Sequence, residues 1–249
     1  MRTSYRLVAI AALIGGAGIA VAAEQTILGK SFAVKNPTPD PTRRSAKTAG
    51  VEKNSPNTIV GNPTNAGPSG GGVLQVFAFG GTPTSQTFLL PQGTSTYTGR
   101  PFWTASGTSQ FKYKDIRGEN SAVKSVSIKR SLGGVFAIKA KISARNGPVV
   151  VVPPNPGTSA CVALQIGSSQ VFGDRYSIQF DATSTLKNKD GKIFKAKKPS
   201  TQGICPGAIP TTTTTSTTTT PSTLGTTTST TLYGSPSRAF LERIIDLLD

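Results

Sequence analysis

Apolar and polar residues alternate in short segments through the middle of this 249-residue chain. Between Phe136 and Ile142 every second residue is apolar, whereas Lys139 and Lys141 occupy positions between them. Successive side chains of a β-strand point to opposite faces, so this period of two predicts a strand with one buried face. A helical period, with apolar residues three or four positions apart, is not found over residues 72–205.

Nine segments with this character are predicted as strands. They cover residues 73–79, 86–90, 111–115, 123–130, 135–142, 149–152, 161–167, 175–180 and 192–197. Short strands separated by Gly-, Asn- and Pro-containing turns favour an all-β fold, a single antiparallel β-sandwich or jelly-roll-like domain. Another strand is predicted over residues 27–35. The Pro- and Gly-rich stretch after it is predicted to be an irregular connection, with one short strand at Asn57–Val60.

The sequence thus divides into five predicted parts. These are a signal peptide (1–23), an N-terminal strand with its Pro/Gly-rich connection (24–72), a β-sandwich domain (73–208, with strand 27–35), a Thr-rich linker (209–234) and an amphipathic helix (235–249).

The first 23 residues have the layout of a secretory signal peptide. Arg2 and Arg6 precede an uncharged apolar run over residues 7–20, and small residues follow as far as Ala22 and Ala23. The run is shorter than the roughly 20 residues that a membrane-spanning helix needs. We therefore expect cleavage after Ala22 or Ala23, no transmembrane segment after cleavage, and a secreted or cell-surface protein.

The two cysteines, Cys161 and Cys205, are predicted to form a disulfide, because an exported chain with an even number of cysteines usually pairs them. Two buried free thiols are the alternative. A metal role is disfavoured because the chain has no histidine and the two thiols stand alone. No metal site and no cofactor is predicted.

Basic residues exceed acidic ones. Loss of the signal peptide leaves 25 basic and 11 acidic residues, a net charge of about +14, which attracts anionic partners. Candidate anion-binding residues on neighbouring predicted strands are Lys112, Lys114, Lys124, Lys129, Arg130, Lys139 and Lys141. The charge alone makes lipopolysaccharide, acidic polysaccharides and extracellular DNA candidate partners. Trp103 and Tyr113 lie near these residues in sequence, so the predicted face is suited to an acidic glycan or a nucleic-acid strand. The alternative is a solubilising face whose lysines prevent edge-to-edge pairing of sheets.

The end of the chain is different in composition. Residues 211–231 include 15 Thr and 3 Ser with no charge, which predicts a disordered, extended spacer. Ser235 and Pro236 then begin a predicted helix. Its apolar face consists of Phe240, Leu241, Ile244, Ile245, Leu247 and Leu248. This docking helix is expected to bind its own domain, a second copy, an unknown envelope or sorting protein, or a lipid surface.

Catalytic patterns are weak. The absence of histidine excludes Ser-His-Asp and Cys-His arrangements and H-E-x-x-H zinc sites. A glycoside hydrolase would need two converging carboxylates, and no spacing singles out a pair among Asp115, Glu119, Asp174 and Asp181. The sequence therefore predicts a protein that is not an enzyme.

Several phrases resemble a group of uncharacterised secreted β-rich proteins of environmental bacteria. They are LGKSFAVKNP, FKYKD, VKSVSIKR, a Cys-bearing strand, IFKAKK with a closing Cys-Pro, and a Thr-rich tail ending in YGSPSRAFL. The similarity covers about residues 27–206. It implies a shared β fold and carries no catalytic residues.

The function predicted from these features is that of an exported, non-enzymatic β-sandwich module. It would have a structural or adhesive role at the cell surface, tethered by the Thr-rich spacer and the docking helix. The alternative is a basic binding module for acidic glycan or another extracellular polyanion.

Overall fold

The computed structural model describes residues 23–37, 40–167 and 173–207. In these residues two sheets of β-strands pack face to face, and the only helical elements are the 3-10 turns η1 (Pro41–Arg43) and η2 (Gly67–Ser69). The predicted all-β sandwich is confirmed. The signal peptide up to Ala22, the Thr-rich linker from residue 209 and the docking helix lie outside the described residues. No helix in the described ranges is long and apolar enough to span a bilayer.

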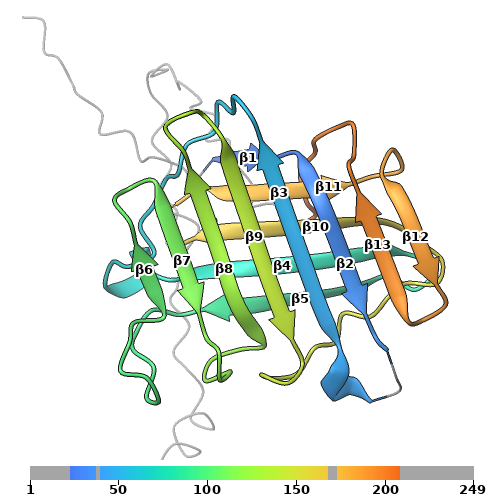
Figure 1. Cartoon of the computed structure of the whole chain (residues 1–249), viewed down its shortest axis with the longest axis horizontal. Helices are drawn as coiled ribbons and strands as arrows, with labels where there is room; N and C mark the ends of the chain where they lie inside the picture. The colour runs from blue at the N-terminus through green and yellow to red at the C-terminus, as the bar shows by residue number, and fades with distance from the viewer. Residues whose placement is uncertain (1–22, 38–39, 168–172, 208–249) are drawn as a thin grey trace, which may run out of the picture. The chain divides into compact units, whose positions relative to one another are not determined.

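The two sheets differ in size. One has the strand order β1 (Glu24–Thr26), β11 (Arg175–Phe180), β10 (Gly157–Ile166), β4 (Gly72–Gly80), β5 (Thr84–Leu90). The other has the order β12 (Thr185–Lys189), β13 (Ile193–Lys197), β2 (Gly29–Lys35), β3 (Ser45–Glu52), β9 (Phe136–Ser143), β8 (Val123–Arg130), β7 (Gln110–Lys114), β6 (Trp103–Ala105). Neighbouring strands are antiparallel except β1 and β11. Figure 1 shows the strands of one sheet crossing those of the other.

The core fills the space between the sheets. Phe32 of β2 packs against Phe180 of β11 with ring centroids 5.8 Å apart, and Phe136 of β9 packs against Tyr176 of β11 at 5.6 Å. Both pairs are fully buried and join the two sheets. The alternate residues of these strands point outward, as the period of two predicted.

The prediction of an irregular connection after residue 37 was wrong for β3. This strand lies in the interior of the eight-stranded sheet, between β2 and β9. Its inward residues are small, Ala46, Thr48 and Gly50, so its sequence has no apolar alternation to recognise. Larger side chains at these positions would crowd the opposite sheet, because even a Cβ atom at Gly50 would lie 3.0 Å from Ile178 Cδ1. Residues 57–60, predicted as a short strand, are not in one.

The four valines at residues 149–152 were also predicted as a strand, and they are not in one. The segment runs beside β5, where side chains make the hydrogen bonds that a strand would make with its backbone. Gln86 Oε1 accepts from the Val150 nitrogen at 2.8 Å, and Thr84 Oγ1 accepts from the Val152 nitrogen at 3.2 Å. Val149 and Val151 are buried, which explains their apolar character without a strand.

The strand predicted over residues 27–35 is present as β2 at Gly29–Lys35, whereas the preceding residues 24–26 form β1, an unpredicted strand of the other sheet. Ile27 lies between them, fully buried, and its nitrogen donates to the Ser177 carbonyl at 2.9 Å. The chain therefore crosses from one sheet to the other within a few residues. The short strands β6 and β12 were not predicted, because β6 has three residues and β12 is largely exposed and polar.

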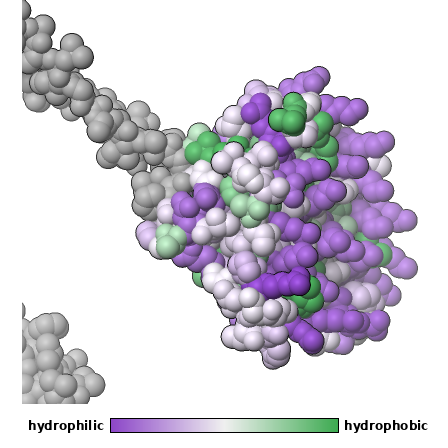
Figure 2. Space-filling view, turned by 60° about the vertical axis from the view of Figure 1, so that its left-hand side comes forward, coloured by the Kyte–Doolittle hydropathy of each residue, from purple (hydrophilic) through white to green (hydrophobic). Residues whose placement is uncertain are grey.

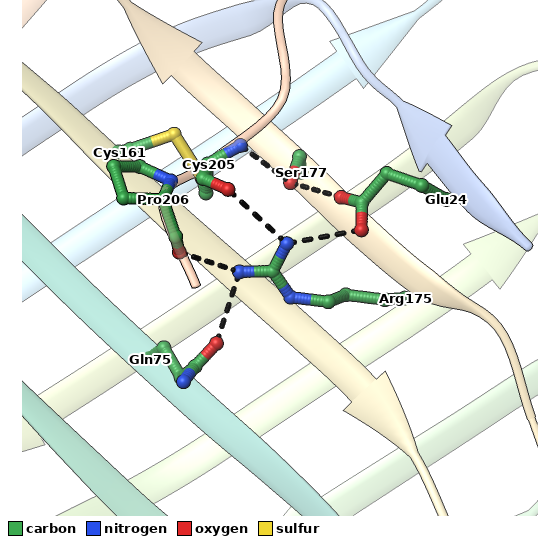
Figure 3. Close-up of a disulfide and its surroundings, with 7 residues drawn as sticks. All are labelled: Glu24, Gln75, Cys161, Arg175, Ser177, Cys205 and Pro206. Atoms are coloured by element: carbon green, nitrogen blue, oxygen red, sulfur yellow. Dashed lines mark hydrogen bonds and ion pairs between the residues drawn. A yellow bond between two sulfur atoms is a disulfide. The ribbon is translucent and has the colours of Figure 1, made fainter. Parts of the chain in front are cut away.

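A closing segment, residues 203–207, covers part of the outer face of the five-stranded sheet (Figure 3). The predicted disulfide between Cys161 of β10 and Cys205 is present. Arg175, 1% exposed, donates to the carbonyls of Cys205 and Pro206 at 3.3 and 3.0 Å, and to Gln75 Oε1 of β4 at 3.0 Å. It also forms an ion pair with Glu24 at 2.9 Å. The buried charge is thus paired, and its hydrogen bonds join β1, β4 and the closing segment.

Removing the disulfide should destabilise the domain without changing its fold. The bond closes a loop with a sequence separation of 44 residues. We expect the Cys161→Ala/Cys205→Ala variant to lose about 4 kcal/mol of unfolding free energy, because its unfolded chain is less constrained. Urea denaturation of the oxidised protein and the variant measures the difference. Equal midpoints would contradict the prediction.

Candidate functional site

A row of lysines crosses the outer face of the eight-stranded sheet. Strand register places these residues in line, each the Cα partner of the next: Lys114 (β7), Ser125 (β8), Lys141 (β9), Lys47 (β3), Ala33 (β2), Lys195 (β13) and Lys187 (β12). At about 4.8 Å per strand the row extends about 29 Å. We call Lys114, Lys141, Lys47, Lys195 and Lys187 the lysine row. In Figure 2 hydrophilic side chains project in rows from the face turned to the right.

Two pairs in the lysine row are directly opposite one another. Lys47 is the Cα partner of Lys141, and Lys187 is the partner of Lys195. Like charges at directly opposite positions destabilise a sheet. The strands β3 and β9 are interior strands, where no edge needs protection from pairing. Edge protection therefore does not account for Lys47, Lys139 or Lys141.

A groove of about 640 Å³ lies over one half of this row. Its lining consists of five lysines, three serines and two isoleucines: Lys47, Lys112, Lys114, Lys124, Lys141, Ser45, Ser125, Ser143, Ile116 and Ile142. Lys124 joins it because the β8–β9 register shifts between Val123 and Ser125. The lining has no carboxylate. Converging ammonium and hydroxyl groups are donors for an anionic ligand with several charged groups.

The lysines of the groove have no ion-pair partner in the described residues. The only ion pair there joins Glu24 to Arg175, and both belong to the five-stranded sheet. An anionic ligand in the groove would therefore meet ammonium groups that form no ion pair within the described residues. Their combined field favours anions beyond direct contact.

A second hollow, of about 430 Å³, adjoins the groove and shares Lys112, Lys114 and Ile116 with it. It adds Arg100, Arg117, the ring of Phe102 and the carboxylates of Asp115 and Glu119 to the lining. The combined surface therefore offers cations, apolar groups and two carboxylates, rather than cations alone.

The structure brings most of the predicted anion-binding residues together. Lys112, Lys114, Lys124 and Lys141 line the groove, and Lys129 and Lys139 lie outward on β8 and β9, neighbouring strands of the same face. Arg130 ends β8 opposite inward-facing Phe136, outside the row. The predicted contribution of Trp103 and Tyr113 is wrong, because both rings are buried in the core, where Trp103 donates to the Leu90 carbonyl at 2.9 Å.

Sequence reasoning missed Lys47, Lys187 and Lys195. Lys47 lies on the unpredicted β3. Lys195 is part of a predicted strand whose alternation was visible, but sequence alone does not place β13 beside β2. The assignment needed the strand order, which no local pattern contains.

The four carboxylates considered for catalysis each accept structural hydrogen bonds. Asp115 accepts from four backbone nitrogens of residues 118–121, and Asp174 accepts from Ala23 and Gln25. The Ser95 hydroxyl and the Thr96 hydroxyl and backbone hold the pKa of Glu119 below its usual value. Hydrogen bonds from Thr183 and Thr201 do the same for the pKa of Asp181. Depressed pKa values keep these two groups ionised at neutral pH, unlike a general acid.

In the described ranges no three His, Cys, Asp or Glu residues are grouped as metal ligands. Comparisons with protein-family models, with curated proteins and with solved structures found no match for this chain. The assignment of function therefore depends on the geometry of the lysine row and the groove.

Neutralising one member of an opposed lysine pair should stabilise the fold. We expect Lys141→Gln to raise the unfolding free energy by about 0.5 kcal/mol at low salt, because it removes repulsion with Lys47. The gain should shrink at high salt, where the repulsion is screened. Urea denaturation at two ionic strengths measures it. The control is Lys53→Gln, a turn residue, for which no change is expected. A destabilised Lys141→Gln protein would contradict the prediction.

Proposed function

We propose that this protein is an exported, non-enzymatic module that binds an acidic polysaccharide at the cell surface or in the extracellular matrix. The observation that supports the proposal best is the position of Lys47 and Lys141, opposite one another on interior strands. Their repulsion lowers the stability of the fold, and neither lysine lies on an edge strand that needs protection from pairing. A bound polyanion would remove that repulsion and release its own counterions.

Export is supported by two features. The signal-peptide pattern of residues 1–23 directs a chain out of the cytoplasm, and the Cys161–Cys205 disulfide suits an oxidising compartment. In that compartment an acidic polysaccharide is an abundant extended anion. The predicted Thr-rich spacer would let the domain reach such a polymer while the docking helix holds another partner.

The chemistry of the groove favours polysaccharide over single-stranded nucleic acid. Nucleic-acid strands bind to platforms of exposed aromatic rings on which bases stack. The rings of Trp103 and Tyr113 are buried in the core, and the groove lining has no aromatic residue. Lysines, serines and Ile116 instead suit repeated carboxylate or sulfate groups on hydroxylated rings.

Binding to a carboxylated polymer should depend on the lysine row and on salt. We expect the protein to bind polygalacturonate and not neutral dextran, with a binding constant that falls steeply as salt rises, because counterions are released. Replacing Lys47, Lys114 and Lys141 together by Gln should weaken binding at least tenfold, and should reduce the slope of log K against log salt by about 2. Isothermal titration at several salt concentrations measures both.

The matched control replaces Lys53, Lys192 and Lys198 by Gln, which makes the same change in net charge outside the row and the groove. If both triple variants lose affinity equally, net charge rather than the site drives binding and the proposal fails. If neither loses affinity, the lysine row has no binding role and a purely structural module remains. Stronger binding to double-stranded DNA than to polygalacturonate or dextran sulfate would redirect the assignment to nucleic acid.

A further inference from the structure

The amino-terminal end of the described chain reaches a buried carboxylate. The backbone nitrogen of Ala23 donates to Asp174 Oδ1 at 2.9 Å, and the Gln25 side-chain amide donates to Asp174 Oδ2. The Ala23 carbonyl in turn accepts from the Arg175 backbone nitrogen at 3.0 Å. Ala23 thus supplies the backbone acceptor at the start of the parallel pairing of β1 with β11, and its nitrogen lies beside Asp174.

Asp174 has an uncompensated charge in the described structure. It is 5% exposed, and a carboxylate buried to this extent is normally paired with a cation. The one ion pair in the described ranges is Glu24 with Arg175, so no lysine or arginine there pairs with Asp174. Its two donors, a peptide N–H and a carboxamide, are neutral. A cation beside Asp174 would therefore have this carboxylate as its counter-ion.

We propose that signal peptidase cleaves between Ala22 and Ala23, and that the new α-ammonium group of Ala23 is the counter-ion of Asp174. Water adds hydroxyl to the Ala22 carbonyl carbon and the proton goes to the departing amine, so an Ala22 carboxylate and an Ala23 amino group form. The amine is protonated at neutral pH. The nitrogen that lies 2.9 Å from Asp174 then carries a positive charge. The inference rests on the export included in the proposed function.

Two observations select this bond over the one after Ala23. Residues 20–22 read Ala-Val-Ala, the A-x-A pattern that precedes a signal-peptidase cut. Cleavage after Ala23 would also remove the donor to Asp174 and the acceptor for the Arg175 nitrogen. Ala23 is exposed, so the remaining protons of its ammonium group can bind water.

The first test is the amino-terminal residue of the exported protein. Protein purified from the medium or envelope of producing cells is analysed by intact mass and by N-terminal sequencing. We expect Ala23. A chain that begins at Glu24, or at any residue before Ala23, overturns the inference.

The second test measures the ion pair on the whole chain from Ala23 to Asp249. Chains with a free Ala23 amine, with an acetylated amine and with one added glycine are compared by urea denaturation. At neutral pH the free-amine form should have an unfolding equilibrium constant roughly tenfold lower than the acetylated form, because only a protonated amine can pair with Asp174. Equal stability of the free and acetylated chains overturns the inference.

The Asp174→Asn variant completes the comparison, because acetylation should then make no difference. A difference that persists in that variant would mean that Asp174 is not the counter-ion. If Asp174→Asn does not fold, the free and acetylated wild-type chains still decide the matter.

Failure of this inference can be told apart from failure of the proposed function. Polygalacturonate binding is measured on the free and acetylated chains and should be equal, since the lysine row belongs to the other sheet. An exported chain that begins elsewhere overturns only the cleavage site. A chain that stays in the cytoplasm with its first 22 residues attached overturns the cleavage and the proposed location together. Loss of the binding alone overturns only the polysaccharide proposal.

Discussion

The aromatic contacts of Phe32 with Phe180 and of Phe136 with Tyr176 join the inner faces of the two sheets. Because alternate residues of each strand must enter this core, every charged residue of the regular strands has to lie on an outer face or be paired. The outer face of the five-stranded sheet is partly covered by the closing segment, where Arg175 is buried. The outer face of the eight-stranded sheet is open to solvent. Lysines can therefore lie there without being buried, and the lysine row is on this face.

The lysine row is a charged surface that the core has to support. Opposed pairs such as Lys47 with Lys141 lower stability, whereas Ser125 and Ala33, which stand between lysines of the row, lessen the repulsion by spacing the charges. Lys187 on the edge strand β12 also protects that edge from pairing, so one lysine can serve two purposes. Lys47 and Lys141 have no such second purpose. A ligand is therefore a better explanation for the interior lysines than for those at the edges.

Sequence patterns predicted the strands whose inward residues are large and apolar. The limits of β8 and β11 were predicted to the residue, because their alternation is strong and their ends are marked by turns. Patterns failed where packing with the opposite sheet decided the residue type, as at Gly50 in β3, and where side chains replaced strand pairing, as with Gln86 beside Val150. The candidate site was predicted only in part for the same reason. Lys112, Lys114, Lys124 and Lys141 lie on predicted strands, whereas Lys47 lies on β3, which was not predicted. A sequence pattern shows that Tyr113 and Lys112 point to opposite faces of the sheet. It does not show which of the two faces is covered by the other sheet.

Strand β11 begins at two contacts that export would complete. Arg175, its first residue, binds the carbonyls of the segment that the disulfide holds, and its backbone nitrogen binds Ala23. Asp174, immediately before it, lies against the nitrogen that cleavage would free. Oxidation and signal removal both occur outside the cytoplasm, and each would complete contacts at the same end of this strand. An exported chain should therefore reach its full stability only after export, because the positive charge of the Ala23 nitrogen beside Asp174 and the covalent link at Cys205 would both depend on it.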